Sequence, residues 1–270
     1  MLINGDSGST ISALDRGLQY GDGVFETIAV ANARPCLWDR HYRRLQAGGS
    51  RLGISIPDHE TLFKEVTQEI GLNDRGVIKI VITRGQGSRG YRPDPKSHST
   101  RLIMFSPWPD YPEAIGRTGV VVRVCKTLLG CNCTLAGIKH LNRLEQVMAR
   151  SEWDDQEISE GLMLDAAGHV IEGTMSNIFM LKSGKISTPD LTKCGVEGVM
   201  RELVLDVAAE LGRAVDIRPI ALPELMEADS LFLTNSLIGV WPVIDIQGTR
   251  FNLDLLDKKL ISEVHNRAYV

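Results

Sequence analysis

The stretch Gly137-Ile138-Lys139-His140-Leu141-Asn142-Arg143-Leu144-Glu145-Gln146-Val147 indicates the fold most directly, and it follows a Cys-, Thr- and Gly-containing segment at residues 131–137. Apolar residues recur at offsets of three and four, at Leu141, Leu144, Val147 and Met148, which predicts one face of an amphipathic helix reaching about Asp155. Lys139 would then stand where a loop enters a helix, between apolar neighbours. A lysine in apolar surroundings loses its charge more easily and can act as a nucleophilic amine, whereas a solvated surface lysine is the simpler alternative.

Composition predicts an ordinary globular chain of one large domain or two smaller ones. Its 270 residues are 43% hydrophobic and 24% charged, with a net charge of -4. Both signs are interspersed, so we expect neither a nucleic-acid nor a membrane partner. The N-terminus lacks the basic and apolar regions of a signal peptide, and we therefore expect a cytoplasmic enzyme.

The cysteines favour reduced thiols over a disulfide framework. There are five, at irregular spacing: Cys36, Cys125, Cys131, Cys133 and Cys194. Cys131-Asn132-Cys133 supplies only half of a metal site, and no second Cys or His pair at ligand spacing accompanies it. We expect no metal.

The N-terminal part carries candidate groups for an anionic ligand. Residues 15–27 form a glycine-interrupted loop followed by an alternating strand, and Asp39 is a plausible N-cap for a helix carrying Arg44. Residues 85–90 match GxGxxG, but Arg92-Pro93 follows, so no helix opens there and a dinucleotide site is excluded. A loop offering Arg84 and Arg89 to carboxylates fits better, with an exposed polar loop as the alternative.

A stiff, turn-rich segment at Trp108–Pro112 marks a boundary between domains. We predict an N-terminal α/β domain at residues 1–110, a linker at 111–117 and a C-terminal domain at 118–270. A hairpin turning at Gly168 then carries a polar cluster that contains Glu172, Ser176 and Asn177.

Two later segments are typical of anion-binding sites. Residues 195–201 enter a helix, where the N–H groups of Val199 and Met200 are available to a phosphate. Thr234-Asn235-Ser236 follows a strand and can add hydroxyl groups. Simple caps and turns are the alternative for both.

Together these segments resemble the fold-type-IV pyridoxal-phosphate enzymes, which include branched-chain and D-amino acid aminotransferases and aminodeoxychorismate lyases. The matching segments occur in the family's order and cover nearly the whole chain: residues 20–26, His41-x-x-Arg44-Leu45, Lys139, Glu172-Gly173-x-x-Ser176-Asn177, residues 198–201 and Thr234-Asn235-Ser236. Residues 84–91 and 136–147 resemble the lyases in particular. The chain departs from the aminotransferase pattern at Met200, where they usually carry threonine, and Ser236 stands where threonine is common.

The resemblance implies an α/β (α+β) fold with a smaller N-terminal domain and a larger sheet-rich C-terminal domain that binds pyridoxal phosphate. Lys139 would hold the cofactor and act as general base, Glu172 would pair with the ring nitrogen, and Ser176 and Asn177 would line the cofactor. Arg44, Val199, Met200 and Ser236 would bind the phosphate. Arg84, Arg89, Tyr91 and Asn235 would contact substrate.

The implied reaction is elimination of pyruvate from 4-amino-4-deoxychorismate to give p-aminobenzoate, the folate precursor, by a homodimer. Three alternatives stay open. The first is a D-amino acid or branched-chain aminotransferase on the same fold, the second is a cofactor-binding protein without turnover, and the third is a protein whose polar clusters are only turns.

Overall fold

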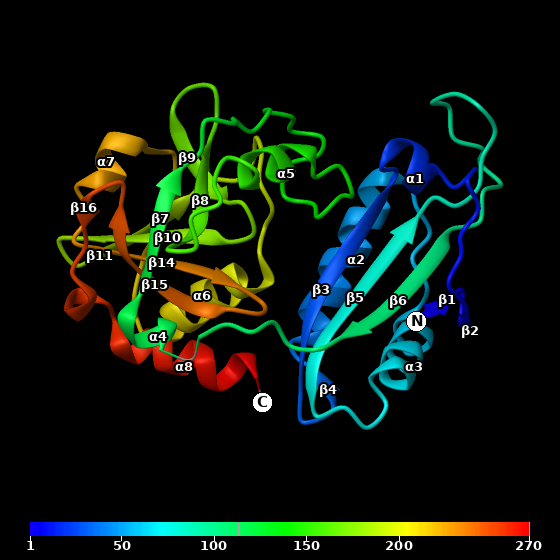
Figure 1. Ribbon diagram of the computed structural model, residues 1–270, viewed down its shortest axis with the longest axis horizontal. Coiled ribbons are helices and arrows are strands. Elements are labelled where there is room, and N and C mark those ends of the chain that lie inside the picture. The colour runs from blue at the N-terminus through cyan, green and yellow to red at the C-terminus, as the bar shows by residue number, and fades with distance from the viewer. Residues whose placement is uncertain (113, 270) are drawn as a thin grey trace. The chain divides into compact units, whose positions relative to one another are not determined.

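The computed structural model describes residues 1–112 and 114–269. The chain forms two compact units (Figure 1). The first comprises Met1–Pro109, Ile138–Asn142 and Tyr269, and the second comprises Asp110–Gly137 and Arg143–Ala268. The domain limits given above stay a prediction, and Glu113 of the predicted linker and Val270 lie outside the described residues.

The first unit is built on an antiparallel sheet of six strands in the order β2-β1-β6-β5-β3-β4. Its long strands are β3 (Gly23–Ala31), β5 (Arg75–Thr83) and β6 (Thr100–Ser106), and its short ones are β1 (Leu2–Ile3), β2 (Asp6–Ser7) and β4 (Arg34–Pro35). Runs of Val and Ile suit strands with a buried face, and Ile28, Ile78 and Ile103 are fully buried.

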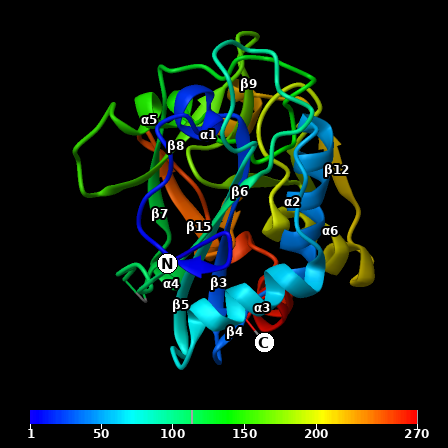
Figure 2. The same cartoon turned by 90° about the vertical axis from the view of Figure 1, so that its right-hand side faces the viewer.

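Helices cover this sheet. α2 (Trp38–Leu52) packs on β3 and α3 (His59–Ile70) packs on β6, as both views show (Figures 1 and 2). The Asp58 side chain accepts a hydrogen bond from the Thr61 N–H and so caps the start of α3. The short α1 (Arg16–Tyr20) precedes β3 and is capped by Asp15.

The second unit contains a mixed sheet of ten strands, ordered β12-β11-β10-β14-β15-β7-β8-β9-β13 with β16 paired to β15. The strands are β7 (Val120–Val124), β8 (Ile158–Leu164), β9 (His169–Gly173), β10 (Asn177–Lys182), β11 (Lys185–Pro189), β12 (Val215–Arg218), β13 (Ile220–Ala221), β14 (Ser230–Asn235), β15 (Gly239–Ile246) and β16 (Thr249–Arg250). The helical elements are α4 (Ile115–Thr118), α5 (Leu144–Arg150), α6 (Val199–Glu210), α7 (Leu222–Met226), the 3-10 turn η1 (Leu253–Leu255) and α8 (Lys258–Ala268).

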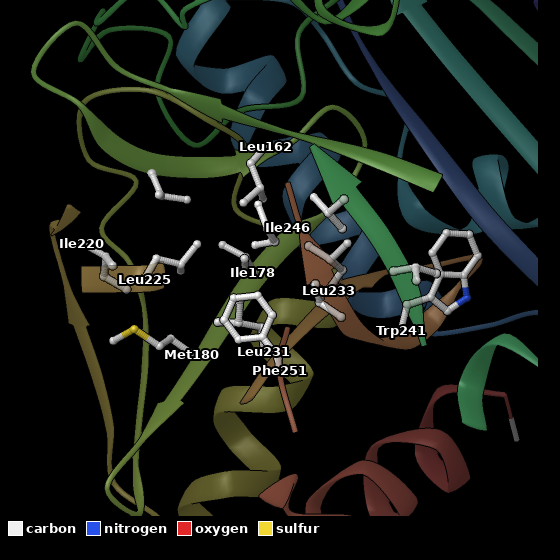
Figure 3. Close-up of a cluster of buried hydrophobic side chains, with 14 of the residues drawn as sticks. Leu162, Ile178, Met180, Ile220, Leu225, Leu231, Leu233, Trp241, Ile246 and Phe251 are labelled. Carbon is white, nitrogen blue, oxygen red and sulfur yellow. The ribbon is translucent and has the colours of Figure 1, made fainter. Parts of the chain in front are cut away.

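The core of the second unit is a hydrophobic cluster between its strands, with Leu162, Ile178, Leu231 and Leu233 fully buried (Figure 3). α6 packs on β14 and on α8. This packing fixes the first turn of α6, which is a candidate anion site.

The predicted mixed α/β fold class is confirmed, but three local predictions are wrong. Residues 138–142 are not the start of a helix, and α5 covers only Leu144–Arg150. The reason is that Leu141 N–H donates to Gly23 O and Lys139 O accepts from Phe25 N–H, both at 3.0 Å, so strand β3 takes the backbone groups that a helix would use. The expected loop at residues 15–27 contains α1. The sequence also predicts one closing helix from about Asn252 to His265, but this stretch is divided into η1 and α8.

The predicted apolar face of α5 is not buried. Leu144, Val147 and Met148 are exposed by 70%, 58% and 57%. No helix within the described ranges is both long and apolar enough to cross a membrane.

Candidate active site

Lys139 lies against strand β3 in the first unit. The two backbone hydrogen bonds just described hold it in an extended conformation, and its Nζ lies 4.5 Å from the centroid of the Phe25 ring. The side chain is half-buried. The segment thus places a primary amine on an aromatic face, in a less polar setting than bulk water.

A buried carboxylate organises the adjoining face of α2. His41 and Arg44 are three residues apart, so they share one helix face and both reach Glu26 on β3. Arg44 Nε donates to Glu26 Oε1 at 2.8 Å, and His41 Nδ1 lies 2.7 Å from Glu26 Oε2. Burial alone raises the pKa of Glu26, but Arg44 and His41 outweigh it and lower this pKa to about 2.

His41 itself is held neutral by its surroundings. Burial lowers the pKa of its imidazole, the Glu26 carboxylate opposes this shift, and the charges of Arg44 and Lys139 add to it. The interaction shows that Arg44 and Lys139 share the neighbourhood of one imidazole. Neither Glu26 nor His41 was a predicted site residue, although a glutamate inside an apolar strand was a signal that could have identified this cluster.

The two predicted substrate arginines have different environments. Arg84 Nε and Nη2 donate to the two oxygens of Asp22 at 2.7 and 3.0 Å, while Nη1 and Nη2 donate to the carbonyls of Gly53 and Leu52 at 2.9 and 2.7 Å. These contacts occupy most of its donors. Arg89 is exposed on the loop that follows.

A second arginine fixes that loop. Arg16, which is 4% exposed, donates to Asp22, to Gly90 O and to Tyr91 O at 2.9, 2.8 and 2.9 Å. Tyr91 is 85% exposed and packs edge-on against Tyr20. Asp22 and Arg16 therefore hold the backbone of residues 84–91, and the side chains of Arg89 and Tyr91 project from a fixed loop.

In the second unit, Glu172 is a buried carboxylate at the end of β9. It accepts a hydrogen bond from Val196 N–H at 2.8 Å, and Asn177 Nδ2 donates to Val196 O at 2.9 Å. Arg143 lies within electrostatic reach: burial lowers the pKa of its guanidinium, and Glu172 and Glu145 oppose that shift.

Ser176 belongs to a second buried cluster around Glu160, which is 1% exposed. The Glu160 carboxylate accepts from Ser176 Oγ at 2.8 Å and from the N–H and hydroxyl groups of Thr174. This arrangement fixes the turn between β9 and β10 and, with it, the position of Glu172. Sequence reasoning did not identify Glu160.

The first turn of α6 fits an anionic group. Its N-cap is Gly198, which provides no side-chain cap, so the amide hydrogens of Val199 and Met200 lack the partner that a capping side chain gives. A Cβ at position 198 would collide with Asn177 Oδ1. Asn235 is occupied in the next loop, where its Nδ2 donates to Met175 O and its Oδ1 accepts from the amides of Leu237 and Ile238.

The predicted site residues thus form two groups. Lys139, Arg44, Arg84, Arg89 and Tyr91 belong to the first unit, and Glu172, Ser176, Asn177, Val199, Met200, Asn235 and Ser236 belong to the second. Their chemistry (an amine on an aromatic face, a buried carboxylate and a helix N-terminus without a side-chain cap) suits pyridoxal phosphate. Among the residues described, no cluster of three or more His, Cys, Asp or Glu could hold a metal ion.

Comparison with known proteins gives one consistent result. The family model of amino-transferase class IV matches residues 23–246. The chain is 37% identical to the aminodeoxychorismate lyase of Vibrio harveyi, over 96% of this chain and 95% of that protein. It is 29% identical to the D-alanine aminotransferase of Bacillus licheniformis, over 87% of this chain and 82% of that one.

Solved structures agree with this result. The 4-amino-4-deoxychorismate lyase of Pseudomonas aeruginosa superposes with a TM-score of 0.94 and 42% identity, over 98% of both chains. The branched-chain amino acid aminotransferase of Escherichia coli shares the fold, with a TM-score of 0.85, 22% identity and coverage of 96% of this chain and 88% of that one. The chain belongs to the amino-transferase class IV family.

Proposed function

We propose that this protein is an aminodeoxychorismate lyase, which eliminates pyruvate from 4-amino-4-deoxychorismate and releases p-aminobenzoate for folate synthesis. The observation that carries the proposal is the likeness to two proteins of that name, at 42% and 37% identity over nearly the full chain. The aminotransferases quoted above are more distant, at 29% and 22%.

Pyridoxal phosphate is the cofactor, and when bound it withdraws electrons from the substrate carbon that carries the amino group. Lys139 would hold it through its amine, and Glu172, which accepts a hydrogen bond from Val196 N–H, would pair with the ring nitrogen. Ser176 and Asn177 keep Glu172 in place from the same turn. Arg44, Ser236 and the amides of Val199 and Met200 bind the phosphate.

Lys139 is also the base. Its Nζ would take the proton from C4 of the substrate, which the bound cofactor makes more acidic. The ring then gains aromaticity as the enolpyruvyl group leaves and becomes pyruvate. The ring of Phe25, whose centroid lies 4.5 Å from Nζ, positions the lysine side chain for this task.

On the substrate side, Arg89 and Tyr91 contact the substrate carboxylates, and Asn235 is a further substrate contact. Arg84 serves this contact indirectly, because its donors are taken by Asp22 and by two carbonyls of residues 52 and 53. Its role is to fix the loop that presents Arg89. This division of work between the two arginines refines the expectation that both bind substrate.

The active form is a cytoplasmic homodimer. The exposed apolar row Leu144, Val147 and Met148 on α5 supports this, because such rows are typical of surfaces that a second copy covers. Val147→Asp shifts the protein toward monomer in sedimentation experiments. Leu72→Asp, at a residue exposed by 99% on the other unit, leaves the dimer intact. A monomeric wild-type protein would contradict the dimer.

The experiment that tests the function compares two reactions of the cofactor-loaded enzyme. One assay supplies 4-amino-4-deoxychorismate and follows pyruvate and p-aminobenzoate; the other supplies D-alanine with 2-oxoglutarate and follows glutamate. The proposal predicts turnover in the first assay and at most slow amino transfer in the second. The reverse pattern identifies an aminotransferase, and cofactor binding without either product identifies a protein that does not turn over.

A further inference from the structure

Two thiols from separate segments of the second unit meet at one point. Cys131 is exposed on the loop after β7, and Cys194 is 6% exposed between β11 and α6; both are free thiols. The Cys131 thiol is close enough to the Cys194 thiol to raise its pKa. One residue along, Asn132 N–H donates to Lys193 O at 2.8 Å, so the backbone holds the two segments together at this position.

The environments of the two sulfurs are complementary. Burial raises the pKa of Cys194 to about 12, and the neighbouring Cys131 adds to the shift, so Cys194 stays protonated. It packs in an apolar cluster with Cys125, Met163 and Leu191, where solutes have little access. Cys131 stands at the surface, where an oxidant in solution reaches it first.

A metal site is not the purpose of this pair. Within the described part of the chain, no set of three or more His, Cys, Asp or Glu is arranged around a possible ion. Cys133 is exposed on the same loop, two residues from Cys131, and provides a matched control because it shares the solvent exposure and the sequence neighbourhood.

We propose that Cys131 and Cys194 are a redox-active dithiol that peroxides convert into a reversible disulfide. The Cys131 thiolate attacks one oxygen of hydrogen peroxide, giving a sulfenic acid and hydroxide. The Cys194 sulfur then attacks the sulfenic sulfur. The S–S bond forms, the sulfenic hydroxyl takes up the proton of Cys194 and leaves as water, and the hydroxide of the first step takes up the proton that Cys131 released on ionising. In sum, two thiols and one peroxide become one disulfide and two waters.

The bond joins segments that matter to the site. Cys194 stands two residues before Val196, whose N–H holds Glu172, and Gly137 N–H donates to Gly195 O at 2.9 Å. The disulfide would therefore tie the segment leading to Lys139 to the one that fixes Glu172. The chemistry of the thiols can be tested without any assumption about the reaction that the enzyme catalyses.

The test is peptide mapping of the intact, cofactor-loaded protein after exposure to hydrogen peroxide, with remaining thiols alkylated before digestion. Trypsin cleaves after Lys126, Lys139, Lys193 and Arg201, so Cys131 and Cys133 share one peptide and Cys194 lies in another. The proposal predicts a linked pair of these two peptides that dithiothreitol separates. The link persists in Cys133→Ser and is lost in Cys131→Ser.

Three results would overturn the proposal. One is a disulfide confined to the peptide of residues 127–139, which would pair Cys131 with Cys133. Another is a link that survives in Cys131→Ser and disappears in Cys133→Ser. The third is sulfinic or unmodified Cys131 without any link. Because Cys131 is exposed, its serine variant keeps the fold, and a circular dichroism spectrum matching the wild type verifies this.

Discussion

At Glu26, a carboxylate stays charged in a place where burial alone favours its neutral form, because Arg44 and His41 both face it. We predict that Glu26→Gln lowers the free energy of unfolding by about 3–5 kcal/mol near neutral pH, since Arg44 is left without its buried counter-ion. Urea unfolding of the two proteins measures this difference. A loss below about 1 kcal/mol would show that the buried pair contributes little.

The same residue predicts a pH dependence. Its pKa is about 2 in the folded protein, below the ordinary glutamate value of 4.5 that holds in the unfolded chain. Its stabilising contribution is therefore fully present above the unfolded pKa and is lost as pH falls through the folded pKa. Burial lowers the pKa of His41 as well. Protonation of this imidazole therefore favours the unfolded chain, and the free energy of unfolding decreases further as pH falls below the ordinary histidine pKa. The difference in free energy of unfolding between wild type and Glu26→Gln should therefore narrow as pH falls from about 5 toward about 2. A gap that stays constant over this range would refute the assignment.

The two substrate-loop arginines make opposite predictions. Arg89→Lys should raise KM for 4-amino-4-deoxychorismate by roughly tenfold or more, because a bidentate carboxylate contact is lost, while Tm stays unchanged. Arg84→Lys should lower Tm, because lysine cannot reach Asp22 and the two carbonyls together. Steady-state kinetics and thermal melts of both variants distinguish them. An equal loss of Tm in both variants would contradict the assignment of Arg89 to substrate binding and of Arg84 to fixing the loop.

At this scale the sequence points to single residues more readily than to their partners. Lys139, Glu172 and the arginines are predicted site residues because their types are unusual beside apolar or glycine-rich neighbours. Glu26, Asp22 and Glu160 were missed as site residues because the groups that make them important lie far away in the chain: His41 and Arg44, Arg84, and Ser176. Local pattern carries no information on such distant pairs.

Among the elements, the first turn of α6 makes the sharpest prediction. Gly198→Ala places a methyl group against Asn177 Oδ1, beside the amides assigned to the phosphate. We predict weaker cofactor binding, by about 1–3 kcal/mol in free energy, measured as the Kd of pyridoxal phosphate. Gly116→Ala is the control, because a Cβ there meets nothing within 4 Å. Equal Kd values for both variants would exclude α6 as the phosphate site.

Elements with strong local signals form where the residue types favour them, including β5 and β7 with their runs of Val and Ile and α3 with its Asp58 cap. The segment at Lys139 was predicted wrongly because two signals compete there. Its apolar spacing is helical, yet strand β3 offers backbone partners to residues 139 and 141, and those hydrogen bonds prevail. The spacing of Leu144, Val147 and Met148 is also misleading, because it marks an exposed surface and no core face.

For the whole molecule, the predicted α/β class and membership of the family are confirmed. The motifs that reveal them are spread over both units, from residues 20–26 to Ser236, which is why no single segment was sufficient. The cofactor should stabilise the folded chain as any ligand of the native state does. We predict that removing pyridoxal phosphate lowers Tm. Compared with protein in cofactor at a thousand times its Kd, the free energy of unfolding should be lower by about 4 kcal/mol. An unchanged melt of the apoprotein would contradict cofactor binding.

The central claim is that Lys139 performs lyase chemistry. Its most direct test is to follow pyruvate and p-aminobenzoate together from 4-amino-4-deoxychorismate, with wild type and Lys139→Ala both loaded with pyridoxal phosphate. The account predicts equal amounts of the two products from the wild type and neither from the variant. Full activity in Lys139→Ala without added amine, or pyruvate without p-aminobenzoate in the wild type, would contradict it.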